Sequence, residues 1–65
     1  MIVVVNEREV EVGERTTVAG LLAALGLPDR GVAVALDSSV LPRSGWATTL
    51  YDGARIEVVT AVQGG

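Results

Sequence analysis

One stretch of this sequence, residues 16–28 (TTVAGLLAALGLP), has the apolar spacing of an amphipathic helix. Its large apolar residues recur at i, i+3, i+4 and i+7 and form one stripe: Val18, Leu21, Leu22 and Leu25. Thr16 or Thr17 is the predicted N-cap, because a hydroxyl can accept from unpaired N–H groups of the first turn. Gly26 is suited to end the helix. The opposite face carries no charge.

Strand patterns precede and follow this single helix. Apolar or alternating runs predict strands at residues 2–6, 9–12, 31–36, 40–42 and 54–62. Asn6, Glu7 and Arg8, where the first run gives way to the second, are few enough for a hairpin connection. One helix among several strands favours the α+β class, with the helix packed across one face of a small mixed sheet. We expect the first and last strands to be neighbours at its centre.

Alternation along these strands predicts two faces. Ile56 and Val58 are expected to face the helix together with Met1, Val3 and Val5. The residues expected on the outside are Ile2, Val4 and Val59. Single exposed apolar residues are normal in soluble proteins. Three of them on adjacent strands would form a patch of the kind that binds partners, and we interpret them as a docking surface.

The composition excludes several function classes. There is no His and no Cys, so the usual nucleophile–base pairs and zinc sites cannot be built, and no metal site is expected. The net charge is −3 and the five Arg are scattered, which argues against nucleic-acid binding. No apolar run is long enough to span a membrane or reads as a signal peptide. We therefore expect a cytoplasmic protein.

The sequence ends in QGG, after a run rich in β-branched residues. A tail without a role is the simplest interpretation, because chain ends commonly tolerate change. Glycine also allows a backbone to approach closely, so a diglycine thread can enter a narrow partner site. Local pattern does not decide between these two interpretations.

Three segments in order resemble one known family: VLPRSGW at residues 40–46, YDGARIEVVTAV at 51–62 and QGG at 63–65. The chain resembles the ThiS family, the sulfur carrier proteins of thiamine biosynthesis, over essentially its whole length. The resemblance implies a ubiquitin-like β-grasp domain at residues 1–62. It also implies a flexible diglycine tail at residues 63–65.

The resemblance further implies that Gly65 is the modified residue. A ThiF-like adenylating enzyme would use ATP to activate its carboxylate, and a sulfur donor such as a cysteine desulfurase would convert it to a thiocarboxylate. A ThiG-like thiazole synthase would then take the sulfur. Gly64 and Gln63 would be recognised as part of the tail. The chain would bind no cofactor itself and would not be an enzyme.

Two alternatives remain open from the sequence. One is a related sulfur carrier resembling the small subunit of molybdopterin synthase, which also ends in two glycines. The other is a ubiquitin-like protein modifier or interaction module. Trp46, beside a loop, is more simply a lid on a small core than a binding residue.

Overall fold

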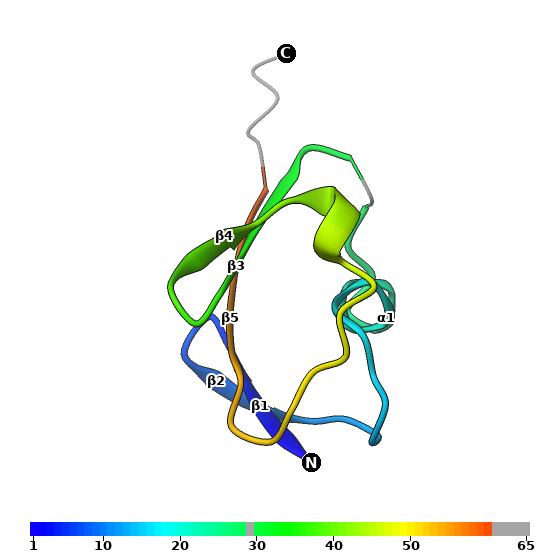
Figure 1. The fold of residues 1–65 in the computed structure, drawn as a ribbon, viewed down its shortest axis with the longest axis vertical. Helices are drawn as coiled ribbons and strands as arrows, with labels where there is room; N and C mark the ends of the chain where they lie inside the picture. Colours follow the sequence, from blue (N-terminus) through cyan, green and yellow to red (C-terminus); the bar gives the residue numbers. More distant parts are fainter. Residues whose placement is uncertain (29, 61–65) are drawn as a thin grey trace.

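The structure is a computed structural model, and it describes residues 1–28 and 30–60. The elements in chain order are β1 (Ile2–Val5), β2 (Arg8–Glu11), α1 (Val18–Ala24), β3 (Val32–Leu36), β4 (Ser39–Leu41), the 3-10 helix η1 (Arg43–Gly45) and β5 (Arg55–Thr60). The strands form one sheet in the order β2-β1-β5-β3-β4. α1 lies across one face of this sheet (Figure 1). The predicted α+β class is confirmed.

β5 is the central strand of the sheet. It runs parallel to β1 on one side and antiparallel to β3 on the other, which makes the sheet mixed. The predicted adjacency of the first and last strands is therefore confirmed. The predicted last strand covered residues 54–62, of which 61 and 62 lie outside the described residues.

The β1–β2 hairpin turns more tightly than the sequence pattern indicated. Asn6 and Glu7 alone form the turn, with φ of 48° and 70°, and Arg8 is already paired with Val5. Two residues at positive φ are typical of a type I′ turn, whose twist matches that of the flanking strands. This pairing places Arg8 on the same face of the sheet as Val5.

α1 is capped at both ends. The Thr17 hydroxyl accepts from the Gly20 N–H at 3.0 Å, which identifies Thr17 as the N-cap. At the other end the N–H of Gly26, at φ 74°, donates to the Ala23 carbonyl, and the N–H of Leu27 donates to the Leu22 carbonyl. These two bonds make a Schellman motif. The chain thus turns back across the helix end at Leu27.

The expected helix stripe is correct for three of its four members. Val18, Leu21 and Leu22 are buried, but Leu25 is 41% exposed. Leu25 is the C-cap rather than a helical residue, and it lies where the helix runs past the end of the β1–β2 hairpin. Leu25 is therefore the one member of the predicted stripe that is not buried in the core.

The core lies between α1 and the inner face of the sheet. Its buried members are Val3, Val5, Val18, Leu21, Leu22, Val34, Trp46, Leu50, Ala54, Ile56 and Val58. Trp46 is 7% exposed and its indole N–H donates to the Leu41 carbonyl at 3.2 Å. The loop carrying Trp46 is tied to α1, because the Ala19 N–H donates to the Trp46 carbonyl at 2.9 Å. Trp46 therefore closes the core, as expected.

Candidate functional site

The residues predicted to carry the chemistry, Gln63, Gly64 and Gly65, lie outside the described residues. The predicted boundary between domain and tail at residue 62 lies there too. What the structure describes is the strand that leads to them. β5 ends at Thr60, five residues before Gly65. The geometry of the site must therefore be built from β5 and its surroundings.

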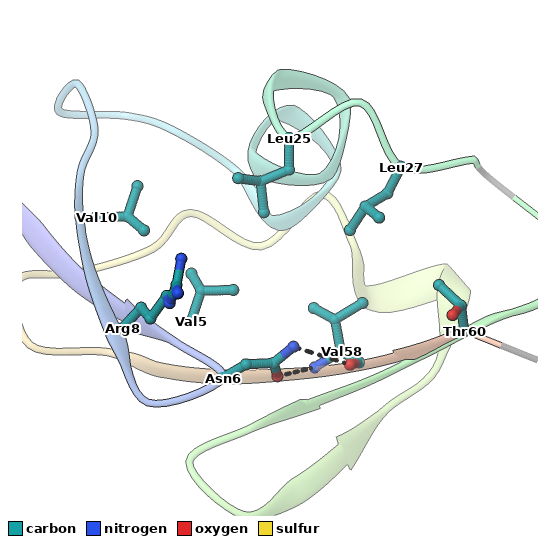
Figure 2. Close-up of a pocket in the computed structure, with 8 residues that line it drawn as sticks. All are labelled: Val5, Asn6, Arg8, Val10, Leu25, Leu27, Val58 and Thr60. Atoms are coloured by element: carbon teal, nitrogen blue, oxygen red, sulfur yellow. Dashed lines mark hydrogen bonds between the residues drawn. The ribbon is translucent and has the colours of Figure 1, made fainter.

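β5 is held on both sides until close to its last described residue. Toward β3 it is paired as far as Thr60, opposite Val32. Toward β1 the strand pairing reaches Val5, and the Asn6 side chain then continues it. The Asn6 amide donates to the Val58 carbonyl at 3.2 Å and its oxygen accepts from the Val58 N–H at 2.8 Å (Figure 2). Because β5 is paired on both sides, the position of Thr60, from which the chain continues toward Gly65, is fixed by the sheet.

The predicted outer-face residues are placed as alternation required. Ile2 is 40% exposed and Val59 is 65% exposed. Val4, the third residue predicted on the outer face, is half-buried. Their sequence neighbours Val3 and Val58 are buried on the helix side. The assignment of the two faces is confirmed, whereas the docking role of Ile2, Val4 and Val59 stays a prediction.

The three residues do not form one contiguous patch. Val4 pairs with Arg55, so Val59 lies four residues further along β5, about 13 Å away at the rise of a strand. Ile2 is further still, because β1 is parallel to β5. The expectation of a single patch was wrong because it used strand adjacency without the register.

Val59 instead belongs to a second cluster on the outer face, which we call the outer hollow. It is a shallow depression lined by Ala33, Val34, Ala35, Val40, Glu57 and Val59. Val40 is 81% exposed and lies opposite Ala35. The small alanine side chains between Val40 and Val59 leave a shallow apolar depression in this part of the sheet surface. It is the part of the outer face nearest to the end of β5.

Ile2 and Val4 lie among charged residues at the other end of the outer face. Ile2 pairs with Glu11 and Val4 pairs with Glu9 across the hairpin. Arg55 lies beside Val4 on the opposite side. Cross-strand partners share a face of the sheet, so two carboxylates border this apolar pair. The outer face thus combines an apolar end with an end bordered by acidic residues.

A second depression, on the helix side, was not predicted from the sequence. We call it the helix-side groove, and its lining residues are Val5, Asn6, Arg8, Val10, Leu25, Leu27, Val58 and Thr60. It lies between the end of α1 and the β1–β2 hairpin (Figure 2). Its volume of about 440 Å³ is within the range of ligand sites. Alternation along β2 places Arg8 on the same face as Val10, and this pattern was the signal available in the sequence.

Among the described residues, none of the helices is long and apolar enough to cross a membrane. Within the same ranges, no group of three or more carboxylates is placed to hold a metal ion. Arg43 lies over the Trp46 ring, with its guanidinium carbon 5.6 Å from the ring centroid. This contact covers the indole that closes the core.

Comparison with known proteins gives one family and close structural matches. The ThiS family matches residues 2–65 of the chain. The crystal structure of a thiamine biosynthesis protein (ThiS) from Geobacter metallireducens is 35% identical, with a TM-score of 0.81 and all of both chains covered. An NMR structure of a thiamine biosynthesis protein from that organism is also 35% identical, with a TM-score of 0.82, covering 100% of this chain and 88% of the other.

A search of curated proteins finds no significant match. The solved structures confirm the predicted fold, a ubiquitin-like β-grasp with one helix over a mixed five-stranded sheet. The family match extends over both terminal glycines as well as the whole folded body. This chain belongs to the ThiS family.

Proposed function

We propose that this chain is a sulfur carrier of thiamine biosynthesis that bears sulfur as a thiocarboxylate on Gly65. The observation that carries the proposal is the family match over residues 2–65, which includes Gly64 and Gly65. The chain is acted upon rather than being an enzyme, a role that the match to the ThiS family supports. Its partners use ATP, which agrees with a cytoplasmic location.

The proposed chemistry has two steps on the carboxyl group of Gly65. A ThiF-like adenylating enzyme joins a carboxylate oxygen to the α-phosphorus of ATP, and pyrophosphate leaves. The terminal sulfur of a persulfide, supplied by a donor such as a cysteine desulfurase, then attacks the acyl carbon, and AMP leaves with that oxygen. A thiol next attacks the donor's sulfur in the resulting acyl disulfide, so that a disulfide forms on the donor side and the thiocarboxylate leaves. The thiocarboxylate so formed supplies sulfur to a ThiG-like thiazole synthase. No cofactor is held by the chain itself in this scheme.

The chain suits a scheme in which its end carries the chemistry and its folded body binds the partner. Glycines at 64 and 65 present no side chains, so the backbone can pass through a narrow channel to a nucleotide. Ordering such a thread costs about 1–2 kcal/mol per residue, so favourable contacts must come from elsewhere. The outer face, with Val59 and Val40 exposed on the two strands that flank β3, can provide these contacts. We propose that the adenylating enzyme docks there, with Ile2 and Val4 at the far end of its footprint.

Intact-mass spectrometry tests the proposal. The chain is incubated with the adenylating enzyme, ATP, cysteine, a cysteine desulfurase and a thiol reductant. Its mass should rise by the difference between one sulfur and one oxygen, and fragmentation should place the change at Gly65. A variant with one alanine added after Gly65 should not be loaded, because its carboxylate is displaced by one residue. An unchanged mass with an enzyme that loads another carrier, or modification elsewhere, would contradict the proposal.

A further inference from the structure

The helix-side groove has aliphatic walls and opens beside the end of β5. Val5 and Val58 form its floor on the sheet, while Leu25 and Leu27 face them from the end of α1 (Figure 2). Leu25 is 41% exposed although it is a large apolar residue. The Schellman turn at Gly26 holds both leucines over the groove. The helix end thus leaves apolar surface uncovered.

Arg8 is the charged residue that lines this groove. It lies on the helix side of the sheet because it pairs with Val5. Within residues 1–28 and 30–60 its guanidinium has neither a hydrogen bond nor an ion pair. A guanidinium beside apolar walls is suited to bind a carboxylate, because its planar donors match the two oxygens. The groove therefore favours an acidic group next to aliphatic ones.

The edge of β5 is open beside the groove. The Ile56 carbonyl accepts from the Asn6 N–H at 2.9 Å, and both backbone groups of Val58 bond to the Asn6 side chain. Backbone groups along a strand alternate in direction, so those of Thr60 point to the same side. β1 has already ended in the Asn6–Glu7 turn at this level. No strand of the described residues lies there to pair with Thr60.

An open strand edge next to a pocket is the arrangement that binds extended peptides. Backbone hydrogen bonds to the edge supply affinity, and alternate side chains enter the pocket and supply specificity. Here the edge is at Thr60 and the pocket is the helix-side groove. A residue placed opposite Thr60 would direct its side chain toward Leu25 and Leu27. The next residue on that face would come within reach of Arg8.

We propose that an extended segment of the adenylating enzyme pairs with β5 at Thr60 and lies in the helix-side groove. Its aliphatic side chain packs against Leu25 and Leu27, and its carboxylate binds Arg8. This inference rests on the proposed function, and it adds a contact on the face opposite the outer hollow. The enzyme would then hold β5 from both faces and from its edge. These contacts would fix the direction in which the residues after Thr60 enter the nucleotide site.

The test compares variants of Arg8 and Leu25 for binding to the adenylating enzyme by isothermal titration calorimetry. Arg8→Gln removes the charge and should weaken binding about tenfold, while Arg8→Lys keeps the charge but loses the planar pair of donors and should restore only part of the affinity. Leu25→Glu should weaken binding at least as much, since it places a carboxylate against the segment's aliphatic side chain. Arg15→Gln is the matched control, because Arg15 is exposed before α1 and does not line the groove. Thermal unfolding of each variant verifies the fold.

The salt dependence supplies a second measurement. The difference in affinity between the wild type and Arg8→Gln should shrink as NaCl is raised, because salt screens a charge pair at an exposed site. Loading of the wild type is followed in the same preparations. If the wild type is loaded but the Arg8 and Leu25 variants bind as it does, the groove proposal alone is overturned. If the wild type is neither bound nor loaded, the proposed function is overturned and the partner assignment falls with it.

Other occupants of the groove would be recognised by their own signatures. A second copy would give a dimer in light scattering that Leu25→Glu abolishes. If the chain's own last residues occupied the groove, Arg8→Gln would leave the affinity for the enzyme unchanged. Deletion of Gly64 and Gly65 would then alter the NMR resonances of Arg8. Either result contradicts the assignment to the enzyme.

Discussion

Asn6 joins two parts of the chain that are 52 residues apart in the sequence. Its side chain bonds to both backbone groups of Val58, and its own backbone turns the hairpin at φ 48°. Asparagine suits both tasks, since it has a donor and an acceptor and tolerates positive φ. One residue therefore ends β1 and extends the ladder on β5. Both backbone groups of Val58 therefore have hydrogen-bond partners, two residues before the last described residue of β5.

Asn6→Gly isolates the contribution of this side chain. Glycine adopts the same φ without strain, so the change removes the two hydrogen bonds and leaves the turn. We expect the free energy of unfolding to fall by about 1–3 kcal/mol, because the partly buried groups of Val58 lose their partners. Chemical denaturation measures it. Asn6→Asp keeps the acceptor and should lose less; equal stability of wild type and Asn6→Gly would show that water replaces the amide fully.

At the scale of elements, short hairpin turns determine which residues face the core. Both hairpins have two-residue turns at positive φ: Asn6 and Glu7 in the first, Asp37 and Ser38 in the second. Asp37 also accepts from the Arg55 N–H at 3.0 Å, which joins the second turn to β5. Neither turn has glycine, although positive φ is strained for residues with a Cβ. Both turns therefore hold residues in a backbone conformation that glycine would adopt with less strain.

Ser38→Gly should raise stability. Ser38 has a φ of 72° and is exposed, so glycine relieves strain without removing a packed side chain. We expect the free energy of unfolding to rise by about 0.5–1 kcal/mol. Differential scanning calorimetry should show a higher midpoint. Ser44→Gly, in η1 at a position without positive φ, is the control and should be neutral or destabilising. A similar loss in both variants would contradict strain at Ser38.

At the scale of the whole molecule, one face of the sheet is covered by α1 and the other is open. The buried core contains no polar or charged residue among those described, so stability comes from the covered face. The outer face carries Val59 and Val40 at one end and Ile2 at the other, all exposed. A change on this face should therefore alter binding and leave folding nearly unchanged.

Val59→Glu should weaken binding to the adenylating enzyme by more than about tenfold, or 1.4 kcal/mol. Val59 lies in the outer hollow nearest the end of β5, so a charge there would be buried by the partner without compensation. Ile2→Glu, at the far end, should have a smaller effect. Ala23→Glu, on the exposed side of α1, is the control. Surface plasmon resonance measures affinity, and wild-type affinity of Val59→Glu would remove the outer hollow from the interface.

The sequence alone determined those features that depend on neighbouring residues. The helix spacing, a threonine N-cap at Thr16 or Thr17 and the stop at Gly26 were readable because each acts within one or two turns. Strand alternation placed Val59 outside and Val58 inside for the same local reason. The order of segments, ending in two glycines, was also sufficient to indicate the family.

Tertiary structure decided the features that depend on register and on how elements meet. The distance between Val4 and Val59 follows from the pairing of Val4 with Arg55, which joins residues some fifty positions apart. The exposure of Leu25 depends on where α1 ends relative to the β1–β2 hairpin, so periodicity within the helix could not reveal it. Such pairings are selected by burial summed over the whole core, a quantity that no local window of sequence contains.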